Sequence, residues 1–312
     1  MPRKLRMQGL QAELSSVNAL LQSAREMDDP VGEFQLEKRK VKIESELQTL
    51  VEHPENRASI ALFFGGKPVL GSRGISAEFA GHMLENFQEL VARKFAAAEL
   101  GTLGGRGPIP MKQATDMMVT NLAKGSFGFV LDELSDQEEI DATALKVIVE
   151  EVVQTIEKVS SSNELDFEEV TEQLDPRLLI SLKDFFVTLD SSEATIRLVD
   201  DLADISLDSM SVHRGRLRTE ATSIDESDVT LDGVLVGFLP EHRKFEMLVE
   251  GQMLYGSVSK DATEQYSQLV ARGENPERQT WKVRMKRRIV TPLNRPAREV
   301  NRLLEFLGLI NA

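Results

Sequence analysis

Residues 281–290 read WKVRMKRRIV, and this stretch decides the fold of the C-terminal part of the chain. Apolar and cationic side chains alternate along it, which predicts a β-strand because successive side chains of a strand point to opposite faces. The predicted apolar face carries Trp281, Val283, Met285 and Ile289. The predicted cationic face carries Lys282, Arg284, Lys286 and Arg288. Arg287 falls on the apolar face, which indicates a strand edge or a bulge.

The sequence around this strand predicts four more. They read VTLDGVLVGFL from residue 229, KFEMLVE from 244, QMLYGSV from 252 and REVNRLLEFLGL from 298, with a helical insert near 260–271. Glycines punctuate these segments where small barrels bend or turn. Five short strands within residues 228–312 predict a small antiparallel β-barrel of the OB or SH3-like kind. A terminal helix is the alternative for the last of them.

Residues 1–55 predict an antiparallel helical hairpin with coiled-coil character. Apolar residues in 5–27 and 36–50 recur at steps of three and four, as on one face of an amphipathic helix. Pro30 and Gly32 break the pattern between them, and Asp28 or Asp29 is placed to cap the second helix. Two such helices cover only one seam of each other, so we predict homo-oligomer formation through this hairpin. The predicted oligomerisation residues are Leu10, Leu14, Val17 and Leu21.

The middle of the chain predicts an α+β unit followed by acidic helices. Residues 56–135 contain the strand-like runs ASIALFF, VLGSRGI, MMVTNLA and SFGFVLDEL, and one long helix at 77–99 with Ser76 as its N-cap. Residues 136–227 are predicted to be mainly helical. The predicted fold class is therefore α+β, with domains at 1–55, 56–135, 136–227 and 228–312.

Charge and composition narrow the classes of function. The formal net charge is -14, and residues 132–208 hold 22 Asp and Glu against 5 Lys and Arg. An acidic surface of this kind repels nucleic acid. The absence of cysteine excludes disulfides and thiol chemistry and favours the cytoplasm. No apolar run approaches the roughly 20 residues of a spanning helix, so we expect no membrane partner.

The basic strand has two interpretations. Residues 276–302 hold nine Lys and Arg against two Glu, and a basic face on a small barrel is one footprint of nucleic-acid binding. With one Trp and two Tyr in the chain, the aromatic platforms that single-strand binders use are missing. The favoured interpretation is that Lys282, Arg284, Lys286 and Arg288 balance the acidic segment 132–208, either within the chain or in another copy.

Two further patterns suggest small sites. The glycine-rich loops at 65–74 and 101–107 contain Lys67, Arg73 and Arg106 as candidate anion ligands, with Arg73 beside a helix N-terminus. Neither loop matches a nucleotide-binding motif, so a turn is the simpler explanation. Glu78, His82, Glu85 and Glu89 form one stripe on the 77–99 helix, which favours a solvated face over a metal site. We predict no metal and no cofactor.

These observations lead to three hypotheses of function. The first is a non-enzymatic interaction protein that self-associates through its hairpin and has a protein partner. The second is a nucleic-acid-binding protein that uses the basic strand. The third is a ligand-binding or catalytic domain organised by the glycine-rich loops, with Lys124 as a further cation. The sequence contains no recognisable catalytic motif, so no catalytic residue is assigned and an enzyme is the less favoured class.

Overall fold

The computed structural model describes residues 1–53, 55–100, 108–123, 127–134, 141–291 and 296–310. Its contacts divide the chain into two compact units, each assembled from several stretches of sequence. The first unit comprises Met1–Phe95, Ile109–Asn163 and Ser181–Arg216, and the second comprises Ala96–Pro108, Glu164–Ile180 and Leu217–Ala312. Within the described residues, no helix combines the length and the apolar character that crossing a membrane requires.

The first unit begins with the predicted hairpin, formed by α1 (Arg3–Glu26) and α2 (Pro30–Glu52). Asp29 caps α2, because its carboxylate accepts a hydrogen bond from the backbone N–H of Gly32 at 3.0 Å. Val17, Leu21 and Ile43 form the buried seam between the two helices. The hairpin and its cap are therefore confirmed.

The first unit also contains a five-stranded antiparallel sheet in the order β2-β3-β1-β4-β5. Its strands are β1 (Ser59–Gly66), β2 (Met118–Ala123), β3 (Phe127–Asp132), β4 (Ala194–Val199) and β5 (Asp204–Leu207). β4 and β5 fall within the segment that was predicted to be mainly helical. The VLGSRGI run, predicted as a strand, contributes an isolated bridge between Val69 and Ile75 and is otherwise a turn.

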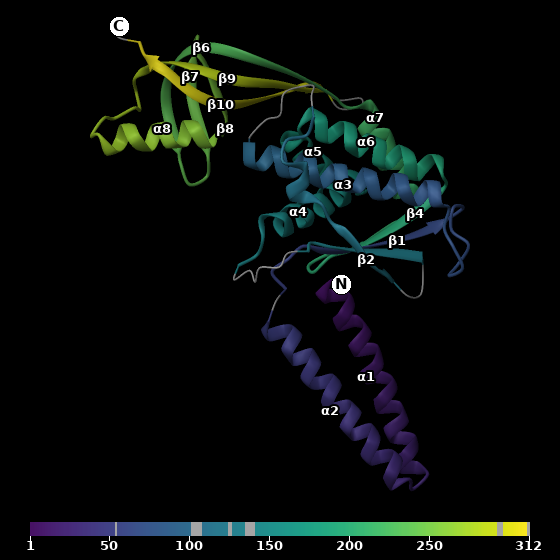
Figure 1. The fold of residues 1–312 in the computed structure, drawn as a ribbon. Coiled ribbons are helices and arrows are strands. Elements are labelled where there is room, and N and C mark those ends of the chain that lie inside the picture. Colours follow the sequence, from purple (N-terminus) through teal and green to yellow (C-terminus); the bar gives the residue numbers. More distant parts are fainter. Residues whose placement is uncertain (54, 101–107, 124–126, 135–140, 292–295, 311–312) are drawn as a thin grey trace. The chain divides into compact units, whose positions relative to one another are not determined.

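The two faces of the sheet are covered by different helices. α3 (Ala77–Leu100), α4 (Ala144–Ser160) and α6 (Pro176–Ser191) lie on one face, and α1 begins at the other (Figure 1). Side chains of β1 alternate between the two faces. Phe64 packs edge-on against Phe79 of α3, with ring centroids 5.4 Å apart. Phe63 belongs to the opposite cluster, against which Leu5 of α1 packs. A 3-10 turn at Lys112–Thr115 precedes β2.

The second unit contains the predicted barrel, which is closed in the order β10-β8-β7-β6-β9. Its strands are β6 (Ser223–Leu239), β7 (Lys244–Val249), β8 (Gln252–Val258), β9 (Thr280–Thr291) and β10 (Arg298–Leu309). The predicted insert is α8 (Lys260–Ala271), and α5 (Glu164–Gln173) belongs to the same unit. α7 (Ser209–Ala221) leads into β6. The last stretch of the chain is a strand, and the alternative of a terminal helix is wrong.

One pairing of the barrel differs from the antiparallel prediction. β8 and β10 run parallel, with Gly256 opposite Asn301. A Cβ on Gly256 would lie 1.9 Å from the carbonyl oxygen of Asn301, so this approach requires glycine. The parallel pair follows from the connection, because α8 and β9 intervene between the two strands and allow the chain to return in the same direction.

Candidate functional site

The basic strand β9 passes through two environments. Over its first half the predicted alternation holds, and Trp281, Val283 and Met285 are buried in the barrel core. Beyond Met285 the alternation changes, because Val290 is buried at 2% exposure whereas Ile289 is 41% exposed. The placement of Ile289 on the buried face is therefore wrong. There the strand pairs with the N-terminal half of β6, which begins well before the predicted barrel boundary.

Acidic groups of the same unit neutralise the second half of β9. Arg288 donates from Nε to Glu226 at 2.5 Å, and its Nη2 lies 3.7 Å from a carboxylate oxygen of Asp175. Lys286 lies 3.5 Å from Glu226 and 3.8 Å from Asp228. The side chains of Lys286 and Arg288 are only 12% and 11% exposed. These two cations are therefore part of a partly buried ionic cluster.

The first half of β9 is more exposed but also faces acids. Arg284 pairs with Glu305 at 3.2 Å, and the register places Lys282 opposite Asp232. In the second half of the strand, Arg287 pairs with Glu299 at 3.0 Å. The surplus of positive charge in the strand is thus matched mainly by acidic residues of β6 and β10, and the acidic segment 132–208 contributes Asp175.

A third cation, Arg302 of β10, borders the ionic cluster of Lys286 and Arg288. It lies opposite Lys286 in the strand register. Burial and the neighbouring guanidinium groups of Arg288 and Arg243 lower the pKa of Arg302, and Glu226 and Asp175 oppose this. The acids of the cluster therefore also stabilise the charge of Arg302.

The candidate oligomerisation residues lie in the hairpin seam. Val17 and Leu21 are buried at 6% and 3% exposure, and the partly buried Leu10 and Leu14 pack against the same cluster. Ion pairs flank the seam within the chain: Arg39 with Glu13, and Arg25 with Glu33 and Glu37. The outer face of α2 instead carries the exposed apolar side chains of Val31, Phe34 and Val41.

The candidate anion ligands of the glycine-rich loops are not gathered into one described site. The ammonium of Lys67 pairs with the carboxylate of Glu193 at 2.6 Å, and the backbone N–H of Lys67 donates to the backbone carbonyl of Glu193. Arg73 is exposed in a turn closed by a hydrogen bond from the N–H of Leu70 to the carbonyl of Gly74. Arg106, the whole 101–107 loop and Lys124 lie outside the described residues.

The acidic stripe of α3 also has partners. Glu89 accepts a hydrogen bond from Arg93 at 2.8 Å, one turn further along the helix. Among the residues that the structure describes, no group of three or more His, Asp or Glu side chains has a geometry that could hold a metal ion. The stripe fits the interpretation as a helix face.

The turn between β4 and β5 gathers charged groups that the sequence analysis did not single out. Asp204 accepts two hydrogen bonds of 2.7 Å from Arg197 and one of 2.9 Å from Gln8 of α1. Hydrogen bonding to Arg197, followed by the bond to Gln8, lowers the pKa of Asp204 to about 2. This network holds the start of α1 against the sheet.

Two further carboxylates near this turn are buried. Lys146 of α4 forms an ion pair with Asp201, and both side chains are largely buried. Burial raises the pKa of the neighbouring Asp200 and also that of Glu150. The sequence signal for this region was the run TIRLV, in which polar and apolar residues alternate, followed by two aspartates, which is typical of a strand that ends in a turn.

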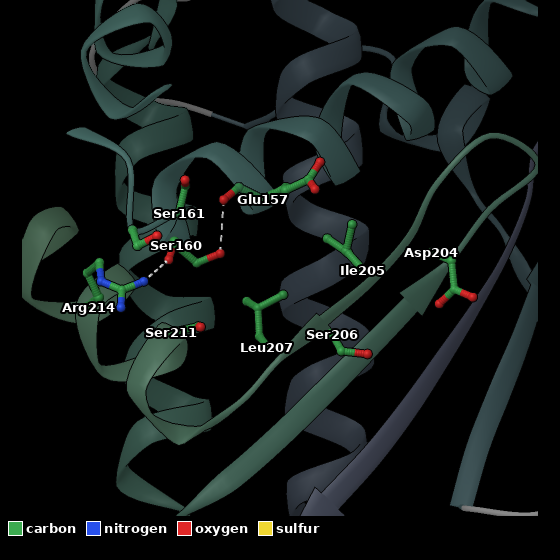
Figure 2. Close-up of a pocket in the computed structure, with 10 residues that line it drawn as sticks. Glu157, Ser160, Ser161, Asp204, Ile205, Ser206, Leu207, Ser211 and Arg214 are labelled. Atoms are coloured by element: carbon green, nitrogen blue, oxygen red, sulfur yellow. Dashed lines mark hydrogen bonds between the residues drawn. The ribbon is translucent and has the colours of Figure 1, made fainter. Parts of the chain in front are cut away.

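A polar groove runs beside β5, the last strand of the sheet in the part of the chain that the structure describes. It has a volume of about 430 Å³ and is lined by the end of α4, by β5 and by the start of α7 (Figure 2). Five of its ten lining residues are serines, namely Ser160, Ser161, Ser162, Ser206 and Ser211. Arg214 donates to the backbone carbonyl of Ser160 at 2.5 Å, and Ser160 donates from its hydroxyl to the carbonyl of Glu157 at 3.0 Å. We call this hollow the β5 groove.

Comparison with protein-family models, with curated proteins and with solved structures finds no match for this chain.

Proposed function

We propose that this chain is a non-enzymatic interaction protein that self-associates through its N-terminal hairpin. The observation that carries the proposal is the apolar outer face of α2. Val31, Phe34 and Val41 are 65%, 61% and 62% exposed. Their spacing of three and seven residues puts them on one side of the helix, opposite the buried Ile43. We call these three residues the α2 outer stripe.

The charges beside the stripe favour a second copy of the hairpin as its partner. The ion pairs of Arg39 and Arg25 with acidic residues are completed within one chain, so they do not require an external partner. The α2 outer stripe, in contrast, is apolar and exposed, and Lys38 lies between Phe34 and Val41 on it. The ammonium of Lys38 lies 4.4 Å from the centroid of the Phe34 ring and shields it partly from water.

Two copies can bury this stripe against each other around a two-fold axis. Antiparallel packing presents the same residues from both copies, as an isologous contact requires, and gives a four-helix arrangement of two hairpins. The 23 residues of α2 form a helix about 35 Å long. A contact along one helix pair is small for a protein interface, so we expect a dissociation constant in roughly the micromolar range.

The seam and the stripe have different roles in this proposal. Leu10, Leu14, Val17 and Leu21 hold α1 against α2 and so maintain the shape of the hairpin. Glutamate at the buried Leu21 would unfold the hairpin itself, because it would place an unpaired charge in the seam. Substitutions in the stripe leave the seam intact and therefore test association directly.

The experiment compares the masses of four proteins by sedimentation velocity at several concentrations. Phe34→Glu should leave a monomer, whereas Gln11→Glu, which adds the same charge at an exposed position of α1, should associate like the original protein. Lys38→Leu should strengthen association, since it joins Phe34 and Val41 into one apolar surface. Equal masses for Phe34→Glu and Gln11→Glu at every concentration would refute the proposal.

A further inference from the structure

The β5 groove runs along the outer edge of β5, with which no described strand pairs. Among the described strands, β5 pairs with β4 alone and ends the sheet. The N–H of Asp200 donates to the carbonyl of Ala203 at 3.1 Å, which fixes these two residues as a bonded pair. Bonding direction alternates along an antiparallel ladder, so Ile205 and Leu207 bond inward to β4. The backbone groups of Asp204 and Ser206 therefore point outward along the groove.

The walls of the groove suit a polar, extended chain. Ile205 and Leu207 are 7% and 3% exposed, so the apolar side chains of β5 are already covered by the first unit. The polar side chains that line the groove supply hydroxyl groups, the carboxylates of Glu157 and Asp204 and the Arg214 guanidinium, and the Asp204 carboxylate is bonded to Arg197. Figure 2 places Glu157 and Ser160 on the α4 side and Arg214 beside Ser160. The hydrogen bond to the carbonyl of Ser160 holds Arg214 at the end of α4.

The negative charge around the β5 groove favours a positively charged peptide. Residues 132–208, which supply α4 and β5, carry 22 acidic residues against 5 basic ones. Glu157 is exposed at the groove, and the C-terminal end of α4 adds the negative end of its helix dipole. A positively charged side chain next to Glu157 is therefore favoured over a negatively charged one.

We infer that the β5 groove binds an extended peptide segment that carries a lysine or arginine. The segment adds to β5 as a sixth strand, with its backbone bonded to Asp204 and Ser206 and its basic side chain beside Glu157. This inference does not rest on self-association, because the groove and the α2 outer stripe are formed by different elements. A second copy pairing through its own β5 is the competing occupant that the test must separate.

The test uses the Phe34→Glu variant of the full chain, so that association through the stripe does not interfere. The probe is a fluorescein-labelled, N-acetylated and C-amidated peptide, Thr-Val-Lys-Val-Thr, measured by fluorescence anisotropy. Ser206→Pro removes one outward N–H without touching the bonds to β4, and it should weaken binding about tenfold. Ser206→Ala keeps that N–H and should bind within about twofold of the parent.

Two further comparisons test the charge and the backbone separately. Glu157→Gln should weaken binding of the lysine peptide several-fold, and it should strengthen binding of a glutamate-containing counterpart, because it removes the repulsion between two carboxylates. If the Ser206→Pro protein does not fold, the same question is tested with peptides that are N-methylated at alternate residues. Methyl groups on the peptide edge that faces β5 should abolish binding, whereas methyl groups on the other edge should not. Absence of binding up to about 1 mM, or equal loss from both methylated peptides, overturns the inference.

Mass measurements on the same variants identify the competing occupant. The Phe34→Glu protein could form a dimer that Ser206→Pro dissociates and Ser206→Ala does not. That result would show that β5 pairs with its own copy, and it would overturn the inference of a peptide partner. A monomer that binds the lysine peptide supports it.

Discussion

Replacing Asp204 by asparagine should lower the free energy of unfolding of the first unit, and the pKa of Asp204 sets the size of the loss. The pKa of this carboxyl falls from an ordinary 3.8 to about 2, chiefly through its two hydrogen bonds with Arg197. That difference corresponds to about 2.4 kcal/mol at neutral pH. The Arg197 side chain is 38% exposed, so solvent screening lowers the expected loss to about 1–2 kcal/mol.

The same pKa gives the effect a direction with pH. A carboxyl whose pKa is lower in the folded chain stabilises that chain above its unfolded pKa. The stabilisation is lost as the pH falls from about 4 through about 2, the folded value. About half of the difference between the original protein and Asp204→Asn should therefore be gone at pH 3.

Urea unfolding followed by circular dichroism between pH 6 and pH 3 measures this difference. Glu193→Gln is the control, because its partner Lys67 and Glu193 itself are 72% and 68% exposed and their pair contributes little. Arg197→Lys, which loses the two-pronged contact, should resemble Asp204→Asn. A difference between original protein and Asp204→Asn that stays constant from pH 6 to pH 3 would refute the assignment of the stabilising charge to Asp204.

The remaining predictions concern the barrel, whose unfolding Trp281 reports by fluorescence because it is the single tryptophan and is 5% exposed. Gly256→Ala should lower the stability of the barrel by about 3 kcal/mol or more, since the new Cβ meets the carbonyl oxygen of Asn301; an unchanged urea midpoint would contradict the parallel β8–β10 pairing. Glu226→Gln should lower the free energy of unfolding of the barrel by about 3 kcal/mol, because the largely buried cations Lys286 and Arg288 each lose an ionic partner. Asp232→Asn, at an exposed position, should lower it by less than about 0.5 kcal/mol. Equal effects of these two substitutions would mean that the ionic cluster is not a structural element.

The barrel strands were readable from sequence because their alternation is local. Trp281, Val283 and Met285 occupy alternate positions and share one core. The prediction failed at Ile289 because β6 extends N-terminally beyond the barrel and pairs with this half of β9, where Val290 becomes the buried side chain. Which face of a strand is buried there depends on a partner more than 50 residues away, and periodicity within the strand does not contain it.

The hairpin and the long helix were also local predictions, set by periodicity and by the caps Asp29 and Ser76. β4 and β5 were missed because they are short and follow a long helical stretch, so the acidic composition dominated the interpretation. Their position in the sheet depends on pairing between β4 and β1, which are more than 100 residues apart.

The candidate sites depended still more on tertiary contacts. Lys286 and Arg288 were identified as cations of one face, but their partner Glu226 is in β6 and Asp175 is at the start of α6. The serines of the β5 groove had no motif in sequence, since the hollow exists only where the end of α4 meets the outer edge of the last described strand of the sheet. Residue spacing predicts faces of elements, and it cannot predict which edge of a sheet remains open.

Sedimentation equilibrium of the unmodified protein, from about 1 to about 200 µM, tests the central claim most directly. We predict that the average mass rises with concentration from the 34.8 kDa of one chain toward twice that value. A mass of 34.8 kDa across the whole range would contradict self-association through the hairpin.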